Sequence, residues 1–175
     1  MAEQLGDLTR THTCGALRPA DVGADVVLLG WVHRVRDLGG VLFIDVRDRG
    51  GITQVVFDKD DESLMAKAKR LRSEYVVGVS GAVRRRSDET VNPKLDTGEI
   101  EIRVSELKVL NKSAVPPFQP GSEEVPNEDT RLKYRYLDLR REPLRDRLLL
   151  RSAMVQAIRK VHHEHGFVEV ETPIL

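Results

Sequence analysis

The part of the sequence that decides the fold is VVLLGWVHRVRDLGGVLFIDVRDRGGITQVVF, residues 26–57. Runs of β-branched and other apolar residues alternate there with two glycine pairs, Gly39-Gly40 and Gly50-Gly51. Such runs joined by short glycine turns are typical of antiparallel hairpins. The stretch therefore predicts a three-stranded meander, with strands at residues 26–37, 41–48 and 52–57.

The hydrophobic pattern changes after the meander. Residues 60–72 carry apolar side chains at helical spacing and predict a helix. Two further strands are expected at residues 75–85 and 99–110, and Gly78 and Gly81 within the first of them indicate a sharp bend. Three strands, a helix and two more strands is the order of an OB-fold, a five-stranded barrel that binds oligonucleotides. The fold class is therefore mainly β.

The chain changes again beyond the predicted barrel. Residues 111–130 contain four prolines and are expected to be a linker. A helix should begin near Pro143 and end at His165, with Gly166 after it, and residues 167–173 should form a strand. One helix and one strand cannot bury their apolar faces alone. This segment is therefore expected to open a larger domain or to pair with another chain.

Composition excludes several classes of protein. The 28 basic residues equal the 28 acidic ones, which excludes a globally basic nucleic-acid binder but allows a locally basic face. The single cysteine, Cys14, forms neither an internal disulfide nor a CxxC zinc pair, and it favours a reducing compartment. No apolar run approaches the ~20 residues of a membrane helix, and the N-terminus lacks a secretory signal.

Phe43 is the most informative candidate for binding. By strand alternation it shares a face with Asp45 and Arg47, whereas Leu42 and Ile44 share the other. An aromatic ring on a wet, partly basic strand face is suited to stacking on a base. The alternative is that the ring packs under a loop or a neighbouring strand.

Other polar residues on the predicted strands are weaker candidates. Arg34 and Arg36 project on one side of the first strand and could contact phosphates or base edges, or simply be solvated. Gln54 could read a base edge or sit on the rim, and Glu101 could accept from an exocyclic amine or be merely exposed. No catalytic or metal site is indicated, since the histidines at 162, 163 and 165 place at most two side chains on one helix face.

Five motifs carry a resemblance to a known family. They are HTCGALR (12–18), GWVHRVRD (30–37), FIDVRD (43–48), RLKYRYLDLRR (131–141) and GFVEVETP (166–173). Together they resemble the N-terminal third of a bacterial-type aspartyl-tRNA synthetase, and LKYRYLDLRR is the most specific. The Gly-Phe-x-x-x-x-Thr-Pro ending resembles motif 1 of class II synthetases.

The resemblance implies a domain plan. Residues 1–110 would be the anticodon-binding OB domain, 111–142 the hinge, and 143–175 the truncated start of the α+β catalytic domain. In this class the last segment forms the homodimer interface, which implies interface roles for Phe167 and Pro173.

The resemblance also implies roles for single residues. Phe43 matches the residue that stacks on an anticodon base, and Arg36, Gln54 and Glu101 match readers of a GUC-type anticodon. Four further positions match nearby or backbone contacts: Arg34, Asp37, Arg72 and Arg84. Val35 replaces an arginine of the usual Arg-Arg-Arg-Asp run, but alternation points it away from its neighbours. Leu38 stands where enzymes that charge both aspartate and asparagine tRNAs often hold His, which favours a discriminating enzyme.

The family's enzymes are cytoplasmic homodimers that use ATP and Mg²⁺ to attach aspartate to tRNA. Their remaining catalytic motifs would lie beyond Leu175, so this chain alone is expected to bind no cofactor and to be inactive as a ligase. Three other hypotheses stay open. They are a standalone single-stranded nucleic-acid module, a protein-binding OB barrel, and a synthetase for lysine or asparagine.

Overall fold

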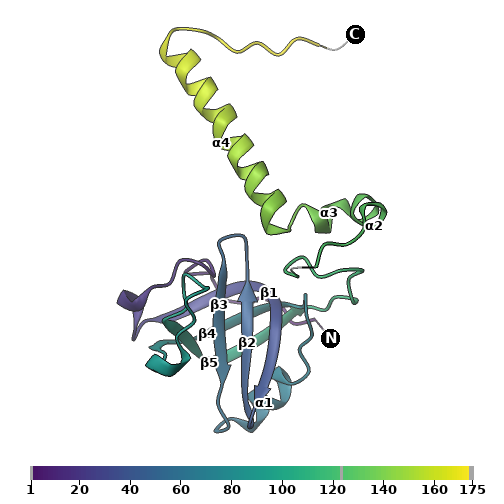
Figure 1. The fold of residues 1–175 in the computed structure, drawn as a ribbon. Helices are drawn as coiled ribbons and strands as arrows, with labels where there is room; N and C mark the ends of the chain where they lie inside the picture. The colour runs from purple at the N-terminus through teal and green to yellow at the C-terminus, as the bar shows by residue number, and fades with distance from the viewer. Residues whose placement is uncertain (1, 123, 174–175) are drawn as a thin grey trace. The chain divides into compact units, whose positions relative to one another are not determined.

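Five strands between residues 25 and 111 close into a barrel (Figure 1). The computed structural model describes residues 2–122 and 124–173. The strands run in the order β1-β2-β3-β5-β4, and α1 (Glu62–Ala68) connects β3 to β4. The predicted OB-type barrel with one intervening helix is thus confirmed. The strands are β1 (Asp25–Leu38), β2 (Val41–Arg47), β3 (Ile52–Phe57), β4 (Val76–Arg85) and β5 (Ile100–Asn111).

The barrel closes through one short parallel pair. Val55 and Val56 of β3 lie opposite Ile102 and Arg103 of β5, whereas the other strand pairs are antiparallel. Closure leaves no long strand edge open to pairing with another chain. The alternating residues that face inward form one core, which includes Leu28, Val32, Ile44, Val46 and Ile102.

Gly81 marks the bend that the sequence predicted in β4. The register between β4 and β5 shifts between Ser80 and Gly81. A Cβ atom at Gly81 would lie 2.0 Å from the carbonyl oxygen of Arg103, which is closer than real atoms approach. Glycine therefore allows β5 to cross β4 closely at this point.

The helix between β3 and β4 is shorter than the predicted 60–72. Asp61 caps its N-terminus, because the side-chain carboxylate accepts from the backbone N–H of Leu64 at 2.8 Å. The helix ends at Ala68, and the following residues form a turn in which Arg72 Nη1 donates to the carbonyl oxygens of Lys69 and Leu71. Met65 and Ala68 belong to the barrel core, so α1 is anchored by its apolar face.

Contacts divide the chain into two units, with the boundary in the sequence between Pro116 and Pro117. The described part of the second unit contains three helices, α2 (Glu128–Lys133), α3 (Arg135–Asp138) and α4 (Glu142–Glu164). Pro143 lies in the first turn of α4, and Gly166 has a φ of +81°, so the predicted start and end of this helix are confirmed. No helix in the described ranges is long and apolar enough to cross a membrane.

One prediction for the second unit needs correction and one is refined. α2 begins in the last residues of the expected linker at 111–130 and α3 lies after it, and the side chain of Asn127 caps α2 by accepting from the backbone N–H of Thr130. Residues 167–173 form no strand, because a strand needs a neighbour and none of the described strands pairs with them. The backbone N–H of Phe167 instead donates to the carbonyl of His162 at the end of α4. Residues 174 and 175 lie outside the described residues.

Candidate nucleic-acid interface

A groove of about 780 Å³ runs along the outside of the barrel. Its walls come from strands of the barrel and from residues 87–92, which follow β4. The groove brings together five of the eight nucleic-acid-binding residues named from the sequence: Arg36, Phe43, Gln54, Arg84 and Glu101. These residues are far apart in the chain, and barrel closure makes them neighbours.

Phe43 provides the groove with an aromatic wall. The ring is half-buried on β2, whereas the flanking Leu42 and Ile44 are 2% and 1% exposed and point into the core. The residue lies opposite Arg36 on β1 and Val56 on β3. The ring is therefore not sealed in the barrel interior, and one of its surfaces is available to a ligand in the groove.

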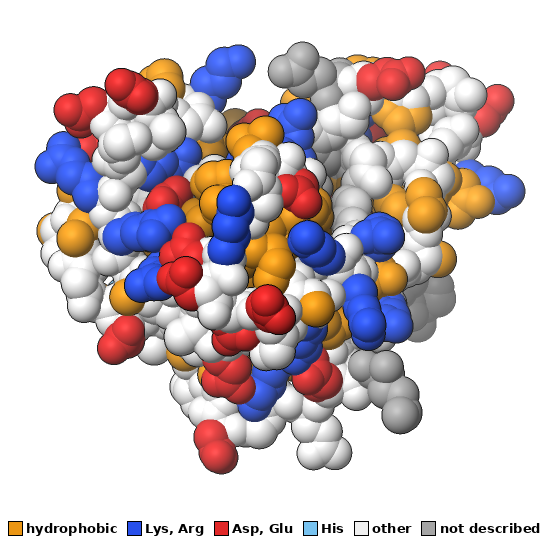
Figure 2. Space-filling model, turned by 90° about the horizontal axis from the view of Figure 1, so that it is seen from below, with side chains coloured by type: hydrophobic (Ala, Val, Ile, Leu, Met, Phe, Trp, Pro, Cys, Tyr) orange, Lys and Arg blue, Asp and Glu red, His pale blue; other side chains and the backbone are white. Residues whose placement is uncertain are grey.

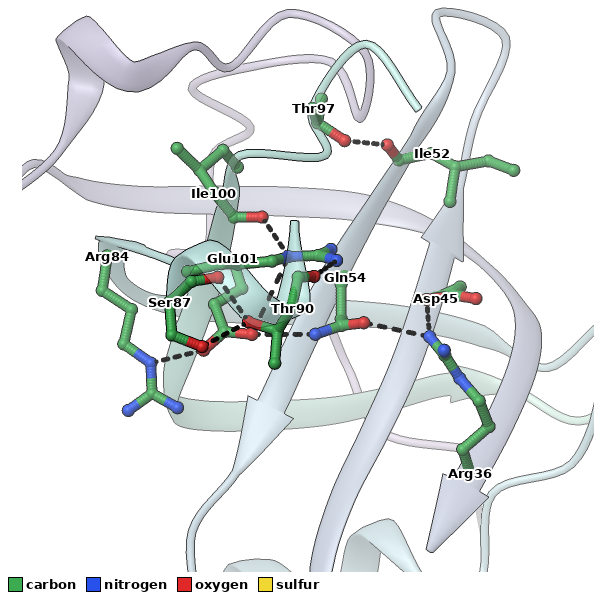
Figure 3. Close-up of polar contacts among 11 residues, drawn as sticks. Arg36, Asp45, Ile52, Gln54, Arg84, Ser87, Thr90, Thr97, Ile100 and Glu101 are labelled. Carbon is green, nitrogen blue, oxygen red and sulfur yellow. Dashed lines mark hydrogen bonds and ion pairs between the residues drawn. The ribbon is translucent and has the colours of Figure 1, made fainter. Parts of the chain in front are cut away.

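Gln54 lies at the centre of a hydrogen-bonded chain across the groove floor (Figure 3). Its Oε1 accepts from Arg36 Nη2 at 3.0 Å, and its Nε2 donates to Glu101 Oε2 at 2.8 Å. Gln54 and Glu101 are 6% and 8% exposed, so neither is a solvated rim residue. The chain joins β1, β3 and β5, and it fixes both side chains before any ligand binds.

On its other side, Glu101 is held by Arg84 of β4 and by Arg86, which comes directly after β4. Arg84 Nε donates to Glu101 Oε1 at 2.8 Å, and Arg86 Nε lies 3.9 Å from Oε2. Arg84 also pairs with Asp58 at 3.5 Å. The groove lining thus contains four arginines, at positions 36, 84, 85 and 86, against two carboxylates, Asp58 and Glu101. The local excess of positive charge suits a polyanion.

Arg84, Arg85 and Arg86 are consecutive in the sequence, and Arg86 is the buried one of the three. The sequence pattern did not indicate Arg86 as a site residue. Its side chain is 4% exposed, and its Nε donates to the carbonyl oxygen of Ile100 at 2.9 Å. Burial lowers the pKa of the Arg86 guanidinium, and the nearby Glu101 carboxylate opposes that change. Its Nη1 donates to Thr90, so Arg86 ties the 87–92 wall to β5. Strand alternation alone could not distinguish this side chain from that of Arg84.

Three residues named from the sequence lie outside the groove lining. Arg34 is exposed on β1. Asp37 accepts from the backbone N–H of Gly40 at 3.2 Å and stabilises the turn between β1 and β2. Arg72 closes the end of α1 through backbone carbonyls, as described above. The geometry gives each of these a local structural contact or an exposed position, and does not place them with the groove residues.

The surface around the barrel is mixed in charge. Figure 2 shows one face of the molecule on which Lys and Arg side chains alternate with Asp and Glu around hydrophobic side chains. This distribution agrees with the net charge of zero. This distribution favours binding of a polyanion through the local arrangement in the groove over binding to a uniformly basic surface.

The described residues contain no group of three or more His, Cys, Asp or Glu side chains that could hold a metal ion. His162 and His165 instead contact backbone carbonyls of their own helix, at Ile158 and Val161. Cys14 is fully buried, and burial raises the pKa of its thiol well above the usual range. A thiol in this state is a poor nucleophile.

Comparison with known families matches both units. Residues 26–110 match a family described as an OB-fold nucleic acid binding domain, and residues 127–175 match tRNA synthetases class II (D, K and N). The chain therefore belongs to the class II tRNA synthetases. Within that class it corresponds to the N-terminal part of bacterial aspartate–tRNA ligases, which confirms the resemblance seen in the sequence.

Two relatives and one solved structure illustrate the match. An aspartate–tRNA(Asp/Asn) ligase of Acidobacterium capsulatum is 51% identical over 100% of this chain and 29% of its own length. An aspartate–tRNA ligase of Macrococcus caseolyticus is 48% identical over 95% of this chain and 28% of its own. An asparaginyl-tRNA synthetase from Pyrococcus horikoshii superposes with a TM-score of 0.77, at 29% identity over 93% of this chain and 37% of that one. The chain thus spans less than a third of the length of these curated relatives.

Proposed function

We propose that the barrel binds the anticodon loop of an aspartate tRNA and reads a GUC-type anticodon. The observation that carries this proposal is the groove itself, in which the Phe43 ring lies beside a fixed chain of donors and acceptors. A ring of this kind stacks on an unpaired base, and polar groups with a fixed orientation distinguish base edges. Arg36, Gln54 and Glu101 are the proposed readers, and Arg84 is a neighbouring contact.

For the chain as a whole we propose the domain plan that the resemblance implies. We propose an anticodon-binding domain at residues 1–110, a hinge at 111–142 and the start of the catalytic domain at 143–175. The long helix α4 exposes an apolar stripe, which includes Leu148, Met154 and Ile158. We assign this stripe, together with the exposed Phe167 and Pro173, to a homodimer interface.

In this proposal, the full-length enzyme carries out the ligase reaction. That enzyme would work in the cytoplasm as an aspartate–tRNA ligase that uses ATP and Mg²⁺. The present chain corresponds to less than a third of its curated relatives, and its groove offers recognition rather than an acyl-transfer site. We expect the purified chain to bind tRNA without aminoacylating it, and ligase turnover by this chain would contradict that expectation.

The central experiment measures the affinity of the chain for anticodon stem-loops. A stem-loop with GUC should bind more tightly than three variants that each change one anticodon base. Each change should cost about 1–3 kcal/mol if the base is read directly. Equal affinity for all four would support a standalone single-stranded nucleic-acid module, and no RNA binding would support a protein-binding barrel.

The same assay separates the related specificities. A GUU loop tests asparagine specificity, and a UUU loop tests lysine specificity. Leu38 lines the groove and is 63% exposed, so it is placed to influence this choice. We propose a discriminating enzyme, which predicts that the GUC loop binds more tightly than the GUU loop. Equal binding of these two loops would instead fit a protein that serves both tRNAs, as the name of the Acidobacterium relative states for that protein.

A further inference from the structure

The contacts of Gln54 fix which way its amide points. An arginine N–H only donates hydrogen bonds, and an ionised carboxylate only accepts them. Because Arg36 lies on one side and Glu101 on the other, the amide oxygen must face Arg36 and the amide nitrogen must face Glu101. The orientation thus follows from the chemistry of the two neighbours and is not an arbitrary choice between two similar atoms.

This orientation has a consequence for reading a base. An amide has two N–H donors and an oxygen with two lone pairs, and the two contacts use one of each. One donor and one acceptor remain in a fixed order along the groove. A base edge that matches this order binds, and the reverse edge meets donor against donor. If the amide were free to rotate by half a turn, either edge would be accepted.

Asp45 controls the Arg36 end of this arrangement. Its Oδ1 accepts from Arg36 Nη2 at 2.7 Å, and the same nitrogen donates to Gln54 Oε1. Asp45 lies directly opposite Gln54 in the β2–β3 register, and its side chain is only 11% exposed. The Arg36 guanidinium reaches past its own register partner, Phe43, to meet this carboxylate. Figure 3 shows Asp45, Arg36 and Gln54 joined in this order.

The Arg36 side chain has few other restraints. It is 35% exposed, and within the described residues its buried Nε has no hydrogen-bond partner. Without Asp45, the guanidinium is free to swing toward the solvent or toward other acceptors along the groove. Gln54 would then lose the donor that defines the position of its oxygen.

We propose that Asp45 is a positioning residue for base recognition, which holds Arg36 so that the Gln54 amide presents a single donor–acceptor order. This proposal rests on the proposed function of the groove, but it adds a residue that is absent from the groove lining. Asp45 acts through Arg36, so its loss should change which base is accepted more than how tightly any RNA is held.

The first test uses the free protein and needs no RNA. The side-chain amide protons of Gln54 are observed by ¹⁵N NMR, and their exchange with water is compared in the parent chain and in Asp45→Ala. Once Arg36 no longer fixes the amide oxygen, the amide can rotate and its nitrogen leaves Glu101, and loss of that hydrogen bond of ordinary strength should speed exchange about tenfold. Asp45→Asn retains an acceptor oxygen and should speed it less. Unchanged exchange in Asp45→Ala, with the thermal melting curve still cooperative, would overturn the proposal.

The second test measures specificity. The affinity ratio between the GUC stem-loop and its single-base variants should fall about tenfold for at least one position in Asp45→Ala. Asp60→Ala is the charge-matched control, because Asp60 is exposed, lies outside the groove lining and pairs only with Arg103 among the described residues. The control should raise affinity for every loop alike and leave the ratio unchanged. An equal fall in both variants, or in neither, would refute positioning by Asp45, whereas a parent chain with no preference would refute the proposed function itself.

Discussion

Glu74 has a backbone φ of +66°, and both oxygens of its buried carboxylate accept hydrogen bonds from Arg47 Nη2, at 2.8 and 3.1 Å. The left-handed conformation costs a non-glycine residue roughly 1–2 kcal/mol. The two-oxygen contact with Arg47 helps to hold this backbone in place between β1 and β4, where Glu74 N–H also donates to the carbonyl of Val32.

Arg47→Ala should therefore destabilise the barrel strongly. The change removes a guanidinium that is 14% exposed from a carboxylate that is 5% exposed, and breaking a buried pair in this way costs about 3 kcal/mol. Urea unfolding followed by circular dichroism measures the loss. Lys67→Ala is a suitable comparison, because its pair with Glu3 is about one third exposed and should contribute under about 1 kcal/mol. Equal losses in the two variants would contradict the importance of the buried pair.

Acid should weaken the fold through His33. Burial lowers the pKa of His33, and the Arg47 guanidinium, which contacts its Nδ1 at 3.1 Å, lowers it further. Between this lowered pKa and the ordinary value of about 6.5, the unfolded chain binds a proton that the native barrel does not. The free energy of unfolding should thus fall as the pH drops below about 6.5 and level off below the native pKa.

A variant isolates this contribution. His33→Gln should make the free energy of unfolding less dependent on pH between about pH 7.5 and about pH 5. His163→Gln, at an exposed position on α4, should leave the dependence as it is in the parent chain. If the free energy of unfolding of the His33 variant depended on pH as strongly as that of the parent chain, another group would have to cause the acid sensitivity.

Phe43→Ala should weaken binding of the anticodon stem-loop by about 1–3 kcal/mol, because the stacking surface is lost. The ring is half-buried on the groove wall and is absent from the barrel core, so the cooperative melting of the variant should be retained. Phe43→Trp keeps an aromatic surface and should bind more tightly than the alanine variant. Fluorescence anisotropy with a labelled stem-loop measures both changes.

Arg34 and Arg84 should differ in their effect on salt dependence. No ion pair engages the exposed Arg34 within the described residues, whereas Arg84 is already paired with Glu101 and Asp58. If Arg34 neutralises a phosphate, Arg34→Ala should lower the slope of log affinity against log salt by about 0.7, with no change in base preference. Arg84→Ala should change the slope less, since its charge is partly compensated. Titration at several salt concentrations compares them, and a larger change for Arg84 would contradict the pairing argument.

Gly81→Ala should cost about 1–3 kcal/mol of stability, because the added methyl group overlaps the backbone of β5. The loss is measured as a lower denaturant midpoint. Gly23→Ala provides a contrast, since nothing lies within 4 Å of a Cβ there and only its φ of +92° opposes the change. A Gly81 variant as stable as the parent would show that the two strands can separate at little cost.

The sequence predicted the barrel closely because strand alternation and glycine turns are local signals. Each predicted strand of the barrel agrees with the structure to within one or two residues at either end. Phe43 was placed correctly on the outer face for the same reason. The strand at 167–173 was not formed, because a strand depends on a partner that periodicity cannot supply.

The polar chain across the groove could not be derived in the same way. Gln54 and Glu101 are 47 residues apart, and they meet only because β3 and β5 pair in parallel. Glu101 looked like an ordinary exposed carboxylate in an alternating strand, although three neighbouring side chains enclose it. Asn127 is a favourable N-cap residue for α2, with its side chain accepting from the N–H of Thr130. The nearby prolines instead led to the prediction of a linker without helices.

Because β3 pairs with β5, the barrel cannot close during synthesis until β5 has been made. The last barrel strand to be synthesised is β5, which lies between β3 and β4, so a nascent chain that ends before Asn111 has an unfilled gap in its wall. Such a chain exposes two strand edges and its apolar interior, which are the features that cause newly made proteins to aggregate. The barrel wall therefore closes only when β5 is available, and an incomplete nascent chain is the stage at which a chaperone would protect it.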